Sequence, residues 1–152
     1  MSVTIRLEGS AELQAQLKGL RGDIRKAASK AVIGTALELR GNIVNSIERG
    51  PASGRTYQKY NPRRVHTASA PGQPPMTDTG RLAGSIYFDT LGELTAVVGS
   101  KLKYAVHLEY GTSRMNFAGG AGGPRPFFRP AIEEIRPKYI GRLEKLLRDT
   151  LR

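Results

Sequence analysis

Hydrophobic and polar residues follow regular patterns along this chain, and the patterns predict most of its helices and strands. Residues 2–8 alternate apolar and polar side chains, which predicts a half-buried strand. Residues 10–20 place leucines at helical spacing after Ser10, a residue that can cap a helix. The longest helical pattern runs from about Ile24 to about Ile47. Its apolar positions are Ala27, Ala28, Ala31, Val32, Ala36, Leu39, Ile43 and Ile47.

The second half of the chain predicts a hairpin and a final helix. Residues 85–90 and 94–99 read as two strands joined by a tight turn. A helix should follow Pro130, and Pro137 should kink or restart it. Together the elements predict an α+β fold in a single domain, residues 1–152. In it a small antiparallel sheet, made of the N-terminal strand and the hairpin, packs on the long central helix and the C-terminal helix.

Two long segments show neither pattern and are expected to be extended loops. Residues 50–77 are rich in Pro, Gly and Ser, and residues 111–124 are rich in Gly. The first segment interleaves basic and aromatic side chains, which contact either nucleic acid or a protein surface. Because no nucleic-acid module is recognisable, we favour protein contact, through an extended arm that is disordered in the free monomer. The candidate contact residues are Arg55, Tyr57, Lys59, Tyr60, Arg63 and Arg64.

The stretch from Tyr104 to Ala131 combines a short ordered element with an aromatic anchor. Its first residues fit either a strand or a short helix, which Gly111-Thr112 should end. Three prolines then stiffen the backbone around Phe127 and Phe128. We expect one phenylalanine to pack between the two long helices, and the other, with Arg125 or Arg129, to face a neighbouring protomer.

A short turn should precede the hairpin, at the sequence Asp78-Thr79-Gly80-Arg81. The side chain of Asp78 or Thr79 can satisfy free backbone N–H groups there, and Gly80 allows a tight bend.

Composition adds a strong positive charge and excludes several classes of protein. The 152 residues carry a net charge of +11, of which residues 49–103 hold +5 and residues 125–152 hold +4. This excess suits a polyanion or an acidic protein surface. There is no Cys, and no apolar run approaches the length of a membrane span. No signal peptide is expected either.

The residues offer no convincing catalytic or metal-binding set. The two histidines, His66 and His107, are far apart, so we expect no metal site. Ser85, His107 and Asp78 could form a triad only on paper, since no nucleophile elbow supports it. The glycines between 118 and 123 lack the Lys-Ser/Thr pair of a phosphate loop. We therefore expect an interaction protein with no cofactor and no enzymatic activity.

Three strings occur in order along the chain: GRTYQKY…HTASAPGQPPMTDTGRLAGSI, VGSKLKYAVHLEYGT and GGPRPFFRPAIEEI. In this combination the chain resembles the tail-component family of long-tailed bacteriophages, over about residues 10–150. The residues that carry the resemblance are Asp78, Thr79, Gly80, Arg81, Leu82, Ser85 and Ile86; Tyr104, Glu109, Tyr110, Gly111 and Thr112; and Arg125, Pro126, Phe127, Phe128, Arg129, Pro130 and Ala131. One departure is the Gly-rich stretch at 118–123.

The resemblance implies a structural protein of the virion, assembled in the cytoplasm of a bacterial host. Such a protein would form a ring at the neck, where the DNA-filled head joins the tail. Its neighbours would be head-completion or stopper proteins, the tail terminator or the tail tube, with packaged DNA in the lumen. Six-fold symmetry is favoured and twelve-fold is the alternative. A free, basic nucleic-acid-binding protein is the alternative function.

Overall fold

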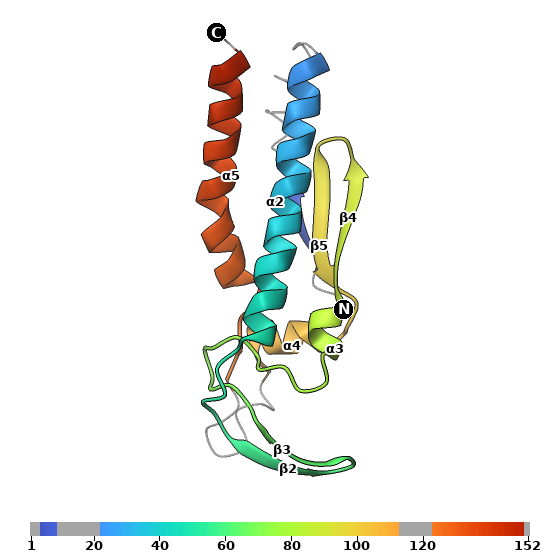
Figure 1. Cartoon of the computed structure of the whole chain (residues 1–152), viewed down its shortest axis with the longest axis vertical. Helices are drawn as coiled ribbons and strands as arrows, with labels where there is room; N and C mark the ends of the chain where they lie inside the picture. The colour runs from blue at the N-terminus through green and yellow to red at the C-terminus, as the bar shows by residue number, and fades with distance from the viewer. Residues whose placement is uncertain (1–3, 9–21, 113–122, 151–152) are drawn as a thin grey trace.

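The computed structural model describes residues 4–8, 22–112 and 123–150, and it has the predicted α+β architecture. Two long helices and an antiparallel sheet form an elongated body, and a second hairpin projects from one end of it (Figure 1). The short helix predicted at residues 10–20 and the Gly-rich stretch at 118–123, apart from Gly123, lie outside the described residues.

Helix α2 (Gly22–Glu48) is the central element, as the hydrophobic pattern predicted. Its buried side chains recur every three or four residues, so they form one stripe along the helix. They are Ile24, Ala28, Val32, Ala36, Leu39, Ile43 and Ile47. Each fully buried large aliphatic side chain stabilises the fold by about 1.5–3 kcal/mol, so this stripe supplies much of the core.

The sheet has the order β1-β5-β4 and packs against α2. Strands β4 (Ile86–Gly92) and β5 (Thr95–Ser100) form the predicted hairpin, with Phe88 opposite Val98. Strand β1 (Thr4–Glu8) adds to the other edge of β5, also antiparallel. Because β5 is central, all its residues from Ala96 to Ser100 are buried.

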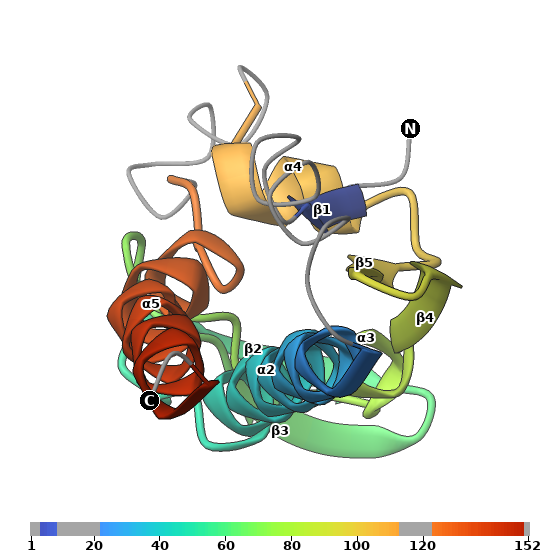
Figure 2. The ribbon, with the colours of Figure 1, turned by 90° about the horizontal axis from the view of Figure 1, so that it is seen from above.

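Helix α5 (Arg129–Thr150) packs on α2, so that α2 lies between α5 and the sheet (Figure 2). Polar contacts also join the helices: Arg142 donates to Thr35 Oγ1 at 3.0 Å and also binds Glu38. The hydrogen bond from Arg142 to Glu38 holds the pKa of Glu38 below its usual value. The helix continues through Pro137 rather than restarting there.

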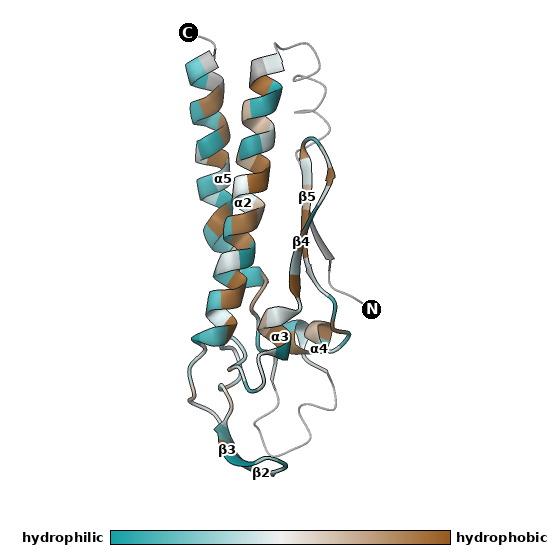
Figure 3. Cartoon of the chain, turned by 45° about the vertical axis from the view of Figure 1, so that its right-hand side comes forward, coloured by the Kyte–Doolittle hydropathy of each residue, from teal (hydrophilic) through white to brown (hydrophobic). Residues whose placement is uncertain are grey.

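The segment 50–77 is not the structureless loop that its composition predicted. It contains a hairpin made of β2 (Thr56–Tyr60) and β3 (Arg63–Thr67), joined by a turn with a cis Asn61–Pro62 bond. Hydrophilic residues predominate on this hairpin, whereas α2 turns an apolar stripe to the body (Figure 3). The hairpin therefore contributes little to the hydrophobic core.

Two short helices connect these parts at the end of the body nearest the second hairpin. Helix α3 (Arg81–Gly84) precedes β4, and α4 (Ala105–Tyr110) follows β5. Of the two forms left open for the stretch after Tyr104, the structure has the helix. Gly111, with a φ of +75°, ends it as predicted. No helix among the described residues is long and apolar enough to cross a membrane.

Candidate interaction site

The inward face of the β2–β3 hairpin is attached to the body through Asp78. In the antiparallel register Lys59 lies opposite Arg64, and both point to the face that carries Tyr57 and His66. Lys59 donates to Asp78 Oδ2, and Arg64 places its guanidinium 2.6 Å from Oδ1 and also donates to the Asp78 carbonyl at 3.0 Å. His66 Nδ1 lies 3.6 Å from the same carboxylate. The carboxylate thus ties two strands to the loop before α3.

Asp78 is held in its charged form by these cations. The hydrogen bond from Lys59 and the positive charge of Arg64 lower the pKa of Asp78 below its ordinary value of 3.8. This is a different role from the one predicted, since the side chain does not cap a helix. Helix α3 has Gly80 at its N-cap position, with no side-chain capping bond. The prediction for Gly80 itself was correct, because its φ of +73° is the tight bend that glycine allows.

The outward face of the hairpin has a different composition. Tyr60 is 80% exposed and Val65 is 63% exposed, and they share this face with Gln58 and Arg63. Arg55 instead stacks over the ring of Tyr57 at 5.4 Å. The six candidate residues of the arm therefore divide: Lys59, Arg64 and Tyr57 turn toward the body, while Tyr60 and Arg63 face away from it. Because Tyr and Arg are enriched among the residues that carry binding energy at protein interfaces, Tyr60 and Arg63 make this face a candidate protein contact.

Glu109 is the residue whose role the sequence did not reveal. Its side chain is 3% exposed, and its carboxylate accepts backbone N–H groups from Phe127 and Phe128 (2.8 and 2.9 Å, on Oε2) and from Arg129 (2.9 Å, on Oε1). These donors stand at the start of α5, where backbone N–H groups have no partner within the helix. Glu109 thus anchors α5 to α4, across about 20 residues of chain.

Phe127 and Phe128 both belong to the core, which corrects the prediction that one faces a neighbouring protomer. Each is 1% exposed, and their ring centroids lie 5.0 Å apart. Glu109 binds the backbone N–H groups of both residues, and both side chains belong to the apolar core cluster that includes residues of α2 and α5. Arg129 stays exposed and lies over the ring of Tyr110 at 5.7 Å. Pro126 precedes the pair, and Pro130 occupies the second position of α5.

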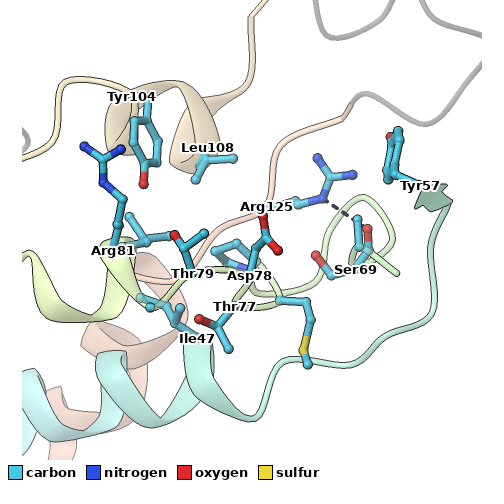
Figure 4. A pocket seen from close by; sticks show the side chains of 15 residues that line it. Ile47, Tyr57, Ser69, Thr77, Asp78, Thr79, Arg81, Tyr104, Leu108 and Arg125 are labelled. Carbon is cyan, nitrogen blue, oxygen red and sulfur yellow. Dashed lines mark hydrogen bonds between the residues drawn. The ribbon is translucent and has the colours of Figure 1, made fainter. Parts of the chain in front are cut away.

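The three motif segments meet around one cavity of about 300 Å³ (Figure 4). Asp78 to Arg81 form one wall, Tyr104 at the N-cap of α4 and Leu108 within it form a second, and Arg125 forms a third. Arg125 Nε donates to the Ser69 carbonyl at 3.1 Å, which joins the third wall to the loop that follows the hairpin. Thr112, just after Gly111, ends the described part of the second motif. Segments far apart in sequence therefore build a single junction at the base of the hairpin.

The structure does not assemble a catalytic triad from Ser85, His107 and Asp78. Ser85 Oγ donates to the Leu82 carbonyl and lies 2.8 Å from Ser100 Oγ, and Asp78 is engaged by Lys59 and Arg64. His107 is exposed on α4. Among the described residues no group of three His, Cys, Asp or Glu is arranged to hold a metal ion.

Comparison of the chain with models of known protein families, with curated proteins and with solved structures found no match.

Proposed function

We propose that this protein is a structural component of the neck of a long-tailed bacteriophage, where it forms a ring that joins the DNA-filled head to the tail. The observation that carries the proposal is the junction just described. The three segments of the resemblance, Asp78–Arg81, Tyr104–Thr112 and Arg125–Ala131, are separated in sequence but line one cavity or bond to one another. Motifs that build one junction support a common structural role.

The β2–β3 hairpin supports a role in assembly. It projects from the body, its outward face is exposed, and Asp78 fixes its direction through Lys59 and Arg64. A projecting element with an oriented contact face suits binding between protomers or to a neighbouring ring of the neck. A six-fold ring would match the symmetry of a tail, and a twelve-fold ring remains the alternative.

The experiment is an amber mutation of this gene in a phage that carries it. If the protein joins head to tail, electron microscopy of the lysate will show DNA-filled heads and complete tails that are not attached. Supplying the protein from a plasmid should restore attachment. Intact infectious particles in the absence of the protein would refute the proposal. Particles with normal necks and defective tail tips would place it elsewhere in the virion.

The alternative, a free nucleic-acid-binding protein, rests on the net charge of +11. Binding through charge alone weakens steeply as salt rises. Two cations of the hairpin, Lys59 and Arg64, are already paired with Asp78 and are therefore less available to bind nucleic acid. A gel shift by the isolated monomer that survives physiological salt would favour this alternative over the neck.

A further inference from the structure

The cavity at the base of the hairpin has the features of a binding site for another protein segment. Its volume of about 300 Å³ lies at the lower end of the range for ligand pockets. Ile47, Leu82 and Leu108 give it apolar lining, enough for one large aliphatic side chain.

Ser69 provides a separate indication that something fills this cavity. The residue lines the cavity and is 1% exposed, and its Oγ has no hydrogen-bond partner within the described structure. Buried hydroxyl groups nearly always have a partner, so an orphaned one calls for a group supplied from elsewhere.

The charges around the cavity select an anionic occupant. The charge of Asp78 is already balanced by Lys59 and Arg64, which leaves Arg81 as an excess positive charge on the lining. Arg81 is exposed and has no hydrogen-bond or ion-pair partner in the part of the chain that the structure describes. Figure 4 shows it on the same side of the cavity as Tyr104. A carboxylate beside an aliphatic side chain would therefore fit this lining.

The tip of the other hairpin carries an aliphatic side chain beside carboxylates: residues 89–92 end β4 and Glu93 opens the turn to β5, and we call residues 89–93 together the β4–β5 turn. All residues from Asp89 to Glu93 are exposed, and they place Leu91, 55% exposed, between two carboxylates. Glu93 has a contact of 3.5 Å with Arg25, in which both side chains are about half exposed. Exposed ion pairs of this kind are weak, so Glu93 is available to another cation.

Resting on the proposed function, we propose that the cavity of one protomer receives the turn Asp89–Glu93 of a second copy. Leu91 fills the apolar part, and a carboxylate of the turn pairs with Arg81. The turn and the cavity lie at opposite ends of the β4–β5 hairpin, so the two surfaces of one molecule do not meet (Figure 1). The contact is head-to-tail, and such contacts close into rings when the rotation between copies allows it.

The tip of the β2–β3 hairpin is a weaker candidate for the same cavity. Tyr60 is highly exposed there, but Arg63 is its cross-strand neighbour. A basic tip would meet the positive charge of Arg81, whereas the acidic turn would be attracted to it.

The test is the self-association of the full chain, measured by sedimentation over a range of concentrations. Leu91→Ser, Glu93→Arg and Arg81→Glu should each weaken association by at least about tenfold, the effect of losing one central interface contact. Combining Arg81→Glu with Glu93→Arg in one chain should restore much of it, because the charges are then exchanged. Ile140→Ser and Glu133→Arg, at exposed positions of α5, serve as controls that should change nothing.

Ser69→Ala adds a readout that a folding defect cannot imitate. It removes an unpartnered hydroxyl, so the monomer should be as stable as wild type or more stable, while association weakens. Circular dichroism should show that every variant is folded.

Three results would overturn the inference: a monomer at every concentration, association that Leu91→Ser and Arg81→Glu leave intact, or no recovery in the exchanged pair. Loss of association in Tyr60→Ser alone would make the hairpin tip the occupant instead. Phage carrying Leu91→Ser that still join heads to tails would remove this inference and leave the proposed function standing.

Discussion

At the scale of single residues, one buried carboxylate fixes the start of a helix. The two carboxylate oxygens of Glu109 accept hydrogen bonds from three backbone N–H groups at the beginning of α5. A negative charge at a helix N-terminus also interacts favourably with the helix dipole. The position of Phe127 and Phe128 over the core therefore depends on a residue in a different helix.

Replacing Glu109 with Ala should destabilise the protein strongly. Each buried donor left without a partner costs about 1–3 kcal/mol, and the substitution orphans up to three. Glu109→Gln should lose less, because its amide oxygen still accepts. Urea denaturation measures the loss, and Glu133→Ala, an exposed acid in the first turns of α5, is the control. Equal stability of Glu109→Ala and the control would contradict this role.

Phe127→Ala and Phe128→Ala should both destabilise the protein. Both rings are fully buried, and truncating a buried phenylalanine costs about 3–5 kcal/mol through lost transfer free energy and the cavity left behind. Tyr60→Ala, at the exposed hairpin tip, should leave the free energy of unfolding nearly unchanged. If one phenylalanine variant remained as stable as wild type, that ring would belong to an interface after all.

At the scale of elements, an ion-pair cluster orients the β2–β3 hairpin. Lys59 and Arg64 sit on opposite strands and share Asp78, so the carboxylate fixes both strands relative to α3. The hairpin has no buried apolar face to hold it, since every position of both strands is exposed or only partly buried.

Acid should loosen this hairpin before it unfolds the body. Because the pKa of Asp78 is lowered in the folded protein, its stabilising contribution is fully present above pH 3.8, its ordinary pKa. The contribution is lost as the pH falls further, through the lowered pKa. Hydrogen exchange of residues 56–67 should report this. At neutral pH Asp78→Asn should produce the same loss of protection, and the exposed Asp89→Asn should not.

The elements that were predictable from sequence are those with one buried face. Helix α2 and the β4–β5 hairpin follow the 3.6 and 2 periods because one side of each packs in the core. The β2–β3 hairpin was missed because its side chains are mostly exposed, so no alternation records the strands. The role of Glu109 was missed because its partners are backbone groups 18 to 20 residues away, which leave no trace in side-chain pattern.

At the scale of the whole molecule, the body and the projecting hairpin are separable. No buried apolar core side chain from the described residues lies between 50 and 67; the core is drawn from α2, α3, the sheet, α4, the Phe127–Phe128 pair and α5. The two ends of the hairpin are also close, since Ala68 N donates to the Arg55 carbonyl at 3.0 Å. The hairpin is therefore built as an attachment to a complete domain.

Deleting residues 56–67 and closing the gap with a short glycine linker should leave the body folded. The free energy of unfolding should change by no more than about 1 kcal/mol, since a shorter loop alters closure entropy only slightly. In a phage complementation assay the same protein should fail to join heads to tails. A deletion variant that does not fold would show that the hairpin stabilises the body, and one that complements fully would remove the hairpin from assembly.

The pairing of α2 with α5 also sets the order of events during synthesis. Helix α2 is complete at Glu48, but its helical partner begins only at Arg129, some 80 residues later. At about 5–20 residues per second, translation takes roughly 4–16 s to cover that distance. Until then the stripe on α2 lacks α5, and Glu109 lacks the N–H groups that it binds. The cavity is completed at the same late moment, by Arg125, so a nascent chain still on the ribosome offers no finished docking surface to its neighbours.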